Sequence, residues 1–176
     1  TFAGNGMNAV DVTWASMGQT LVMGFIFDRM STLLAPAFVT IGLLVVIYSF
    51  PYMSDKNKEH PDAPRRRFYV YFSTFIGAMA GLAYSSTIVG QLVFFEITGV
   101  CSWGLISYYM TPTAKKAGMK ALIITHIGAL GLYIGAAFLF AGTGTFALSA
   151  ISQLDSGMKT VVLLLILFAA WAKSAQ

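Results

Sequence analysis

The stretch from residue 91 to residue 109 constrains this chain most, because it is long and apolar and yet carries a carboxylate. It reads QLVFFEITGVCSWGLISYY, with Glu96 deep inside it. A charged side chain at the centre of a bilayer costs about 2.5–3.5 kcal/mol on insertion scales, so such groups are paired, protonated or placed beside water. Two other apolar stretches each hold a base, His126 and Lys173. A buried acid with a buried base on a neighbouring helix is the arrangement that a proton relay needs.

The composition is that of an integral membrane protein. Of the 176 residues, 57% are apolar and 10% are charged, and the mean hydropathy is +0.72. Soluble domains carry about 25% charged residues. The basic residues lie in loops between apolar stretches and form no face suited to nucleic acid. The single Cys101 excludes a disulfide framework and a cysteine-based metal site.

The apolar stretches predict an all-α, polytopic transmembrane helix bundle with five or six spans. Hydropathy places spans at residues 30–53, 68–84, 88–110, 121–140 and 160–176. The first would be about 35 Å long as a helix, enough to cross a hydrocarbon core of about 30 Å. The last is at the low end of that length and has no basic flank. We therefore expect it to be a broken-off span, and the chain to be part of a longer protein.

The remaining segments are predicted to lie at the membrane faces. Residues 1–29 form an extracytoplasmic loop, in which residues 12–27 predict a hairpin turning at Met17-Gly18-Gln19, with an irregular loop as the alternative. Residues 111–120 predict a loop, and residues 146–154 a short amphipathic surface helix. Gly77 and Gly81 have the spacing of closely packed helices.

The loop charges predict the orientation of the bundle in the membrane. Arg29 and Lys159 lie on one side of the predicted spans. The other side carries eight basic residues: Lys56, Lys58, Arg65, Arg66, Arg67, Lys115, Lys116 and Lys120. By the positive-inside rule the second side is cytoplasmic, together with the loop over residues 55–67. The arginine run could instead bind phosphate or lipid headgroups, but a topology determinant is the favoured interpretation.

Helix rise places the buried charges at similar depths. Counted from the non-cytoplasmic side at about 1.5 Å per residue, Glu96 lies about 14 Å deep, and Lys173 and His126 about 21 Å. A spread of about 7 Å allows contact between side chains on tilted helices. For each residue the alternative is a purely structural polar link, and for Lys173 a side chain that reaches to the membrane surface.

Several strings of the sequence resemble one membrane protein family when they are read in order. They are YSFPYMSDKN, LVFFEITGVCSWGLISYY, KALIITHIGALGLYIGAAFLF, GTFALSAI and AAWAKSAQ. They resemble the antiporter-like proton-translocating subunits of complex I, of energy-converting hydrogenases and of Mrp antiporters. The hydrogenase-4 membrane component D is the most similar of these. The resemblance runs from about residue 24 to the end and implies part of a fold with about fourteen helices, here its second to seventh.

The resemblance also assigns roles to particular residues. Glu96 resembles the essential glutamate of the family's fifth helix, and Lys173 the lysine of the seventh helix that pairs with it. Lys120 resembles a lysine at the cytoplasmic end of the sixth helix. His126 and Ala129 stand where complex I subunits often carry arginine and aspartate, so the chain departs from that part of the charge network.

The predicted function is proton translocation through the Glu96–Lys173 pair, as one subunit of a membrane-bound hydrogenase or complex I-like oxidoreductase. His126 and Lys120 are the further proton-translocation candidates. The chain itself is expected to hold no cofactor, metal or redox centre; iron–sulfur clusters and a nickel–iron or quinone site would lie in partner subunits. The alternatives are an Mrp-type sodium/proton antiporter subunit and a scaffold subunit that transports nothing. The expected location is a bacterial or archaeal cytoplasmic membrane.

Overall fold

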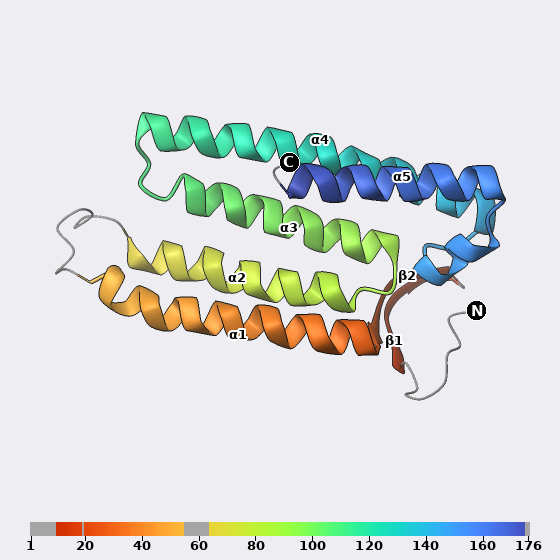
Figure 1. Ribbon diagram of the computed structural model, residues 1–176, viewed down its shortest axis with the longest axis horizontal. Coiled ribbons are helices and arrows are strands. Elements are labelled where there is room, and N and C mark those ends of the chain that lie inside the picture. The colour runs from red at the N-terminus through yellow and green to blue at the C-terminus, as the bar shows by residue number, and fades with distance from the viewer. Residues whose placement is uncertain (1–9, 19, 55–63, 175–176) are drawn as a thin grey trace.

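The computed structural model describes residues 10–18, 20–54 and 64–174, which form a hairpin followed by a helix bundle (Figure 1). Helices α1 (Arg29–Tyr52), α2 (Arg65–Tyr84), α3 (Ile88–Ile106) and α4 (Pro112–Thr143) lie side by side in chain order. The fifth helix, α5 (Ser156–Lys173), packs on α4. Within the described ranges this confirms the predicted helix bundle, with five α-helices where the resemblance implied six.

Four of the described helices are long and apolar enough to cross a membrane, namely α1, α3, α4 and α5. Helix α2, which covers the predicted span at residues 68–84, is a helix but is not among the four. Its first turn holds the arginine run, and tyrosine, serine and threonine follow among its apolar residues. Since it lies between α1 and α3 and packs on both, it runs through the same layer as they do.

The helix ends differ from the hydropathy boundaries, most of all in α4. The predicted loop over residues 111–120 is wrong, because α4 already begins at Pro112. Thr111 caps this end by accepting a hydrogen bond from the Ala114 N–H at 3.2 Å, and proline is favoured at a first helical position. Hydropathy marks where a helix enters hydrocarbon, whereas capping marks where the helix begins. At 32 residues, α4 is about 48 Å long and extends beyond the hydrocarbon core.

The predicted hairpin is present, so the irregular-loop alternative is wrong for the described residues. Strands β1 (Val10–Met17) and β2 (Thr20–Phe27) pair in antiparallel register. Gly18 has φ +62°, a conformation that favours glycine, at the turn between them. The two strands lie at the end of the bundle where α1 starts (Figure 1).

Backbone hydrogen bonds tie the hairpin to the helices. The Ser86 N–H donates to the Gly24 carbonyl of β2 at 2.9 Å, and the Thr87 hydroxyl donates to the Val22 carbonyl at 2.8 Å. On the other side, the Leu148 N–H donates to the Ser86 carbonyl at 3.0 Å. The segment between α2 and α3 therefore joins β2 to the loop after α4.

That loop contains a 3₁₀ helix, η1 (Leu148–Gln153), within the segment predicted as a surface helix. Ala150 and Leu154 are buried, because η1 packs on both α4 and α5. The short helix is thus present within the predicted segment. It is a 3₁₀ helix, and one of its sides is buried and not exposed at the surface.

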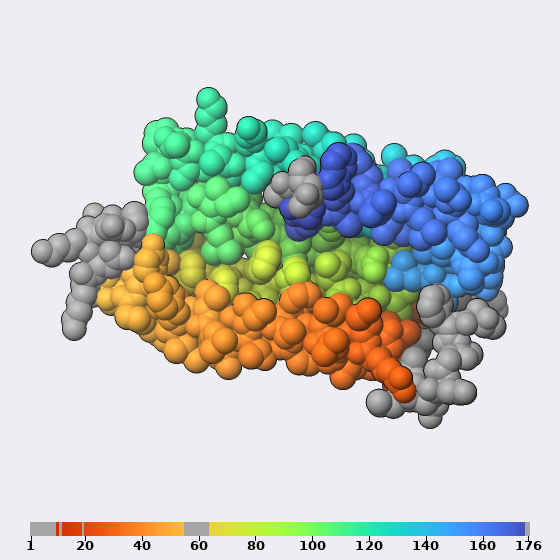
Figure 2. All heavy atoms as spheres, in the orientation of Figure 1, coloured from red at the N-terminus to blue at the C-terminus, as the bar shows by residue number. Residues whose placement is uncertain are grey.

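The hydrophobic core lies between α3, α4 and α5. It includes Phe95, Leu132 and Ala169, whereas α1 buries only small residues against its neighbours. Helix α1 forms one edge of the bundle, as the space-filling view shows (Figure 2). Its exposed side chains are mostly large and apolar, which suits a surface in contact with lipid.

We expect Asp28→Ala to destabilise α1 by about 1 kcal/mol, because Asp28 is its N-cap. The Asp28 carboxylate accepts from the Ser31 N–H at 2.7 Å, and the Ser31 hydroxyl accepts from the Asp28 N–H at 2.9 Å. Hydrogen bonds from the Ser31 backbone, then from its hydroxyl, hold the pKa of Asp28 below its ordinary value of 3.8. The contribution is therefore complete above about pH 4 and is lost as the pH falls through the lowered pKa.

Thermal unfolding in detergent measures this effect. Asp28→Asn is the matched control, since its side-chain oxygen still caps the helix. An equal loss of stability in both variants would contradict the capping role.

Candidate functional site

The site is built around Glu96, which projects from the middle of α3. Its Oε2 atom lies 3.2 Å from Nδ1 of His126 on α4. The Glu96 side chain is 21% exposed and the His126 side chain 57%. The pair is an ion pair when His126 is protonated and a hydrogen bond when one proton is shared. Either state places an imidazole, a group that can take up and release a proton, directly on the carboxylate.

The second carboxylate oxygen of Glu96, Oε1, is buried and accepts no hydrogen bond within the described residues. An unsatisfied buried acceptor costs roughly 1–3 kcal/mol, and more when it is charged. A half-satisfied carboxylate gains by taking up a proton, a water molecule or a cation. The arrangement is therefore suited to binding and releasing a charge.

Lys173 approaches the same part of α3 from the last turn of α5. Its Nζ donates to the Phe95 carbonyl at 3.4 Å and lies 4.6 Å from the centre of the Phe95 ring. The predicted pairing of Glu96 with Lys173 is not a direct ion pair here, since the ionic contact of Glu96 in the described residues is with His126. The two still interact through space. Helix α5 ends partway along the bundle (Figure 1), and Lys173 lies in its last turn.

Lys120 is not brought together with the other three predicted residues. It is exposed near the start of α4, six residues before His126. In the described part of the chain it makes no hydrogen bond or ion pair to Glu96, His126 or Lys173. It lies at the end of the bundle that also carries Lys115 and Lys116.

Two residues at this site were missed in the sequence. Tyr133 lies seven residues after His126 on the same side of α4, and its hydroxyl interacts with Glu96. The spacing of seven, two helical turns, was the available signal. Phe95, which contacts Lys173 through both its ring and its carbonyl, was hidden because nothing in the sequence distinguishes it from Phe94.

A cavity of about 430 Å³ lies beside Lys173. It is lined mainly by apolar side chains of α2, α3 and α5, with Gln91, Thr98 and Ser174 as the other polar residues. The cavity leaves the lysine side chain room to change its position. In the described ranges no three His, Cys, Asp or Glu side chains lie close enough to hold a metal ion.

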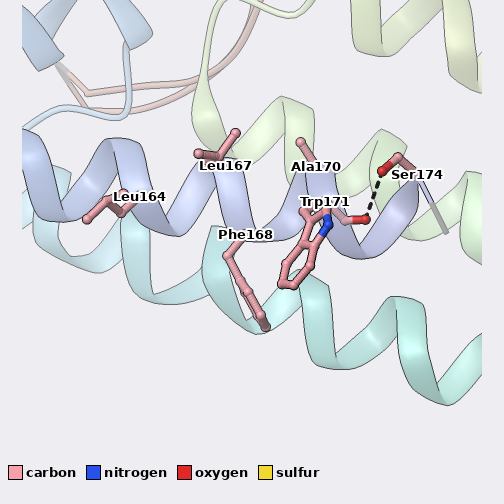
Figure 3. A pocket seen from close by; sticks show the side chains of 6 residues that line it. All are labelled: Leu164, Leu167, Phe168, Ala170, Trp171 and Ser174. Carbon is pink, nitrogen blue, oxygen red and sulfur yellow. Dashed lines mark hydrogen bonds between the residues drawn. The ribbon is translucent and has the colours of Figure 1, made fainter. Parts of the chain in front are cut away.

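The outer side of α5 differs from the side that carries the lysine. Leu164, Leu167, Phe168 and Trp171 surround an open apolar hollow of about 570 Å³ (Figure 3). Ser174 closes its end by donating a hydrogen bond to the Trp171 carbonyl at 3.0 Å. This apolar hollow adjoins the cavity beside Lys173, since Ala170 and Ser174 line both.

Close packing of α4 on α5 holds Lys173 in place. Gly128, Gly131 and Gly135 are buried on α4. A Cβ added to Gly131 would lie 2.5 Å from the Leu165 backbone oxygen, so the two helix backbones touch there. Of the predicted GxxxG pair on α2, Gly81 is covered by the Phe94 ring, whereas a Cβ at Gly77 would meet nothing within 4 Å. The packing prediction is thus correct for one of the two glycines.

Fold and site together define a helical integral membrane protein with an acid and a base in contact between two of its helices. Residues 85–176 match the family model described as NADH:quinone oxidoreductase/Mrp antiporter, TM. Residues 14–69 match the model for the N-terminus of NADH-ubiquinone oxidoreductase (complex I) chain 5. The chain belongs to this family of antiporter-like membrane proteins.

Relatives in the same family are much longer than this chain. NAD(P)H-quinone oxidoreductase chain 5 of Synechocystis sp. is 32% identical over 98% of the chain and 26% of the relative. The chain 5 protein of Picosynechococcus sp. is 34% identical over 93% of this chain and 26% of the relative. The chloroplast NAD(P)H-quinone oxidoreductase subunit 5 of Mutisia acuminata is 31% identical over 98% of this chain and 24% of the relative. The chain thus spans about a quarter of the length of these relatives.

Solved structures show the same fold. The Mrp complex from Dietzia sp. DQ12-45-1b matches with a TM-score of 0.80 and 26% identity, over 99% of this chain and 19% of that one. The archaeal membrane-bound sulfane sulfur reductase matches with a TM-score of 0.70 and 21% identity, over 84% of this chain and 30% of that one. The second likeness concerns the fold alone.

Proposed function

We propose that this chain is part of a proton-translocating membrane subunit of a complex I-like oxidoreductase or membrane-bound hydrogenase. The observation that carries the proposal is the contact of Glu96 with His126, with Lys173 bound to the adjacent Phe95. The relatives named NAD(P)H-quinone oxidoreductase chain 5 support the oxidoreductase assembly. The hydrogenase assignment rests on the motif resemblance.

In this proposal Glu96 is the proton carrier. Desolvation favours its protonated form, and an approaching cation favours the ionised form. Lys173 supplies that cation from α5, and His126 exchanges the proton with Oε2 across the 3.2 Å contact. Lys120 belongs to the basic end of the bundle, where protons would enter from the cytoplasmic side. Tyr133 orients the Glu96 carboxylate from two helical turns further along α4.

The energy for translocation comes, in this proposal, from partner subunits. They would hold the iron–sulfur clusters and the nickel–iron or quinone site, and this chain would respond to their redox changes by moving charge. The end of the bundle with Arg65–Arg67 and the start of α4 would face the cytoplasm. Most of the loop predicted to be cytoplasmic, residues 55–63, lies outside the described residues.

Sodium/proton antiport is the second candidate function, since the Mrp complex from Dietzia sp. has the higher TM-score of the two structures. A sodium-coupled subunit would show translocation that depends on the sodium gradient in vesicles, whereas a proton-only subunit would not. A scaffold subunit would transport neither ion. The hydration of the cavity beside Lys173 separates a transporting subunit from a scaffold.

A double-mutant cycle on Glu96 and Lys173 tests the proposal. We expect Glu96→Gln and Lys173→Ala, each measured as proton translocation by the full-length protein in sealed vesicles, to be strongly non-additive. Each change alone disables the same charge pair, so the double variant should be little worse than either single one. Effects that simply multiply would show that the two residues do not act as a unit, and wild-type rates in both would favour the scaffold function.

A further inference from the structure

Among the described residues, the hydrogen bond and the ring contact of the Lys173 ammonium group are both with Phe95. Its Nζ donates to the Phe95 carbonyl at 3.4 Å, and the same ammonium group lies 4.6 Å from the centre of the Phe95 ring. The carbonyl is already engaged, because the Thr98 hydroxyl donates to it at 2.7 Å. A long hydrogen bond to a shared acceptor, together with a ring face, is a modest attachment for a charged group inside a bundle.

A better acceptor for Lys173 belongs to the next residue along α3. Oε1 of Glu96 is buried and has no hydrogen-bond partner in the described residues, while Oε2 is occupied by His126. Lys173 and Glu96 already attract each other through space. The Glu96 carboxylate therefore has one oxygen, Oε1, without a hydrogen bond in this part of the chain, while the ammonium group of Lys173 is bound to the preceding residue, Phe95.

Open space lies beside the lysine side chain in its present position. Phe95, Thr98 and Lys173 line the same cavity of about 430 Å³. Gly99 presents no side chain there, and even a Cβ at this position would stay 3.7 Å from the lysine Nζ. The Lys173 side chain therefore has room to move away from the Phe95 carbonyl.

We propose that Phe95 is a positioning residue that holds Lys173 away from Glu96, so that the lysine alternates between Phe95 and the free Oε1. With Lys173 on Phe95, Glu96 shares its proton with His126; with Lys173 on Oε1, the carboxylate is stabilised as an anion and gives that proton up to His126. The proposal deepens the proposed function and rests on it. The other titratable groups beside Glu96 and Lys173 in the described residues are Tyr133 of α4 and Cys101 of α3.

The test is the titration of Glu96 in Phe95→Leu, read from the infrared band of its protonated carboxyl group in the full-length protein. The band is assigned by its loss in Glu96→Gln. Removing the ring takes away one of the two described contacts of Lys173 and leaves only the long hydrogen bond to the backbone carbonyl. The lysine should therefore shift toward Glu96 and lower the titration midpoint of the carboxyl group by about one pH unit or more. Phe95→Tyr keeps a ring face and should retain the wild-type midpoint.

Two controls make the result specific. Phe94→Leu removes the neighbouring ring, which packs over Gly81 and away from the site, and should not move the midpoint. In a Lys173→Ala background, Phe95→Leu should also leave the midpoint unchanged, because no lysine remains to be released. An unchanged midpoint in Phe95→Leu alone, or equal shifts with and without Lys173, would overturn the proposal.

This readout does not depend on transport. A shifted midpoint in a protein that moves no protons would support the positioning of Lys173 by Phe95 while contradicting the proposed function.

Discussion

Glu96→Gln is expected to reduce proton translocation by about 100-fold or more, the scale of losing a proton-transfer group. Glutamine has nearly the same size and shape, so it leaves no cavity and can still accept a hydrogen bond from His126. It cannot bind or release a proton at this position. The rate should be measured with a pH-sensitive dye in sealed vesicles that contain the full-length protein with its partner subunits.

The matched control is Asp155→Asn, the same carboxyl-to-amide change at an exposed site. Asp155 caps α5 by accepting from the Gly157 N–H at 3.1 Å, and asparagine caps equally well. It should therefore keep wild-type translocation and assembly. Wild-type translocation in Glu96→Gln would rule out Glu96 as the proton carrier, whereas loss of assembly would assign it a structural role.

Gly131→Ala is expected to destabilise the bundle by about 1–3 kcal/mol, the usual cost of overpacking. The added Cβ would lie 2.5 Å from the Leu165 carbonyl oxygen, and a backbone atom cannot rotate away as a side chain can. Helix α5 must therefore move from α4. Lys173, at the end of α5, would move with it, so translocation should fall together with thermal stability in detergent.

Gly77→Ala is the control for this effect, since it makes the same chemical change within a helix of the bundle. A Cβ at Gly77 meets nothing within 4 Å. Alanine should leave the stability unchanged or raise it by up to about 1 kcal/mol, because alanine is the better helix former. Equal losses of stability in Gly131→Ala and Gly77→Ala would show that the contact between α4 and α5 is not the cause of the effect at Gly131.

The helices could be predicted from the sequence, although α2 is not among the described helices that are long and apolar enough to cross a membrane. Apolar length identifies a span, and a rise of about 1.5 Å per residue places Glu96, His126 and Lys173 at similar levels. The ends of α4 could not be found in this way. Lys115 and Lys116 are polar but fully helical, and only the cap at Thr111 marks the start.

Contacts at the site depend on how each helix is rotated and which helix lies beside it. The sequence placed an acid and two bases at one level and suggested that Glu96 pairs with Lys173. The packing instead turns His126 of α4 onto Glu96, and it directs Lys173 to the adjacent Phe95. Rise along one helix is a local property of the backbone, which the sequence alone determines. The direction in which a side chain points from its helix matters only relative to a neighbouring helix. The packing of α4 on α3 therefore decided that His126 meets Glu96, and the close approach of α5 to α4 at Gly131 decided where Lys173 lies.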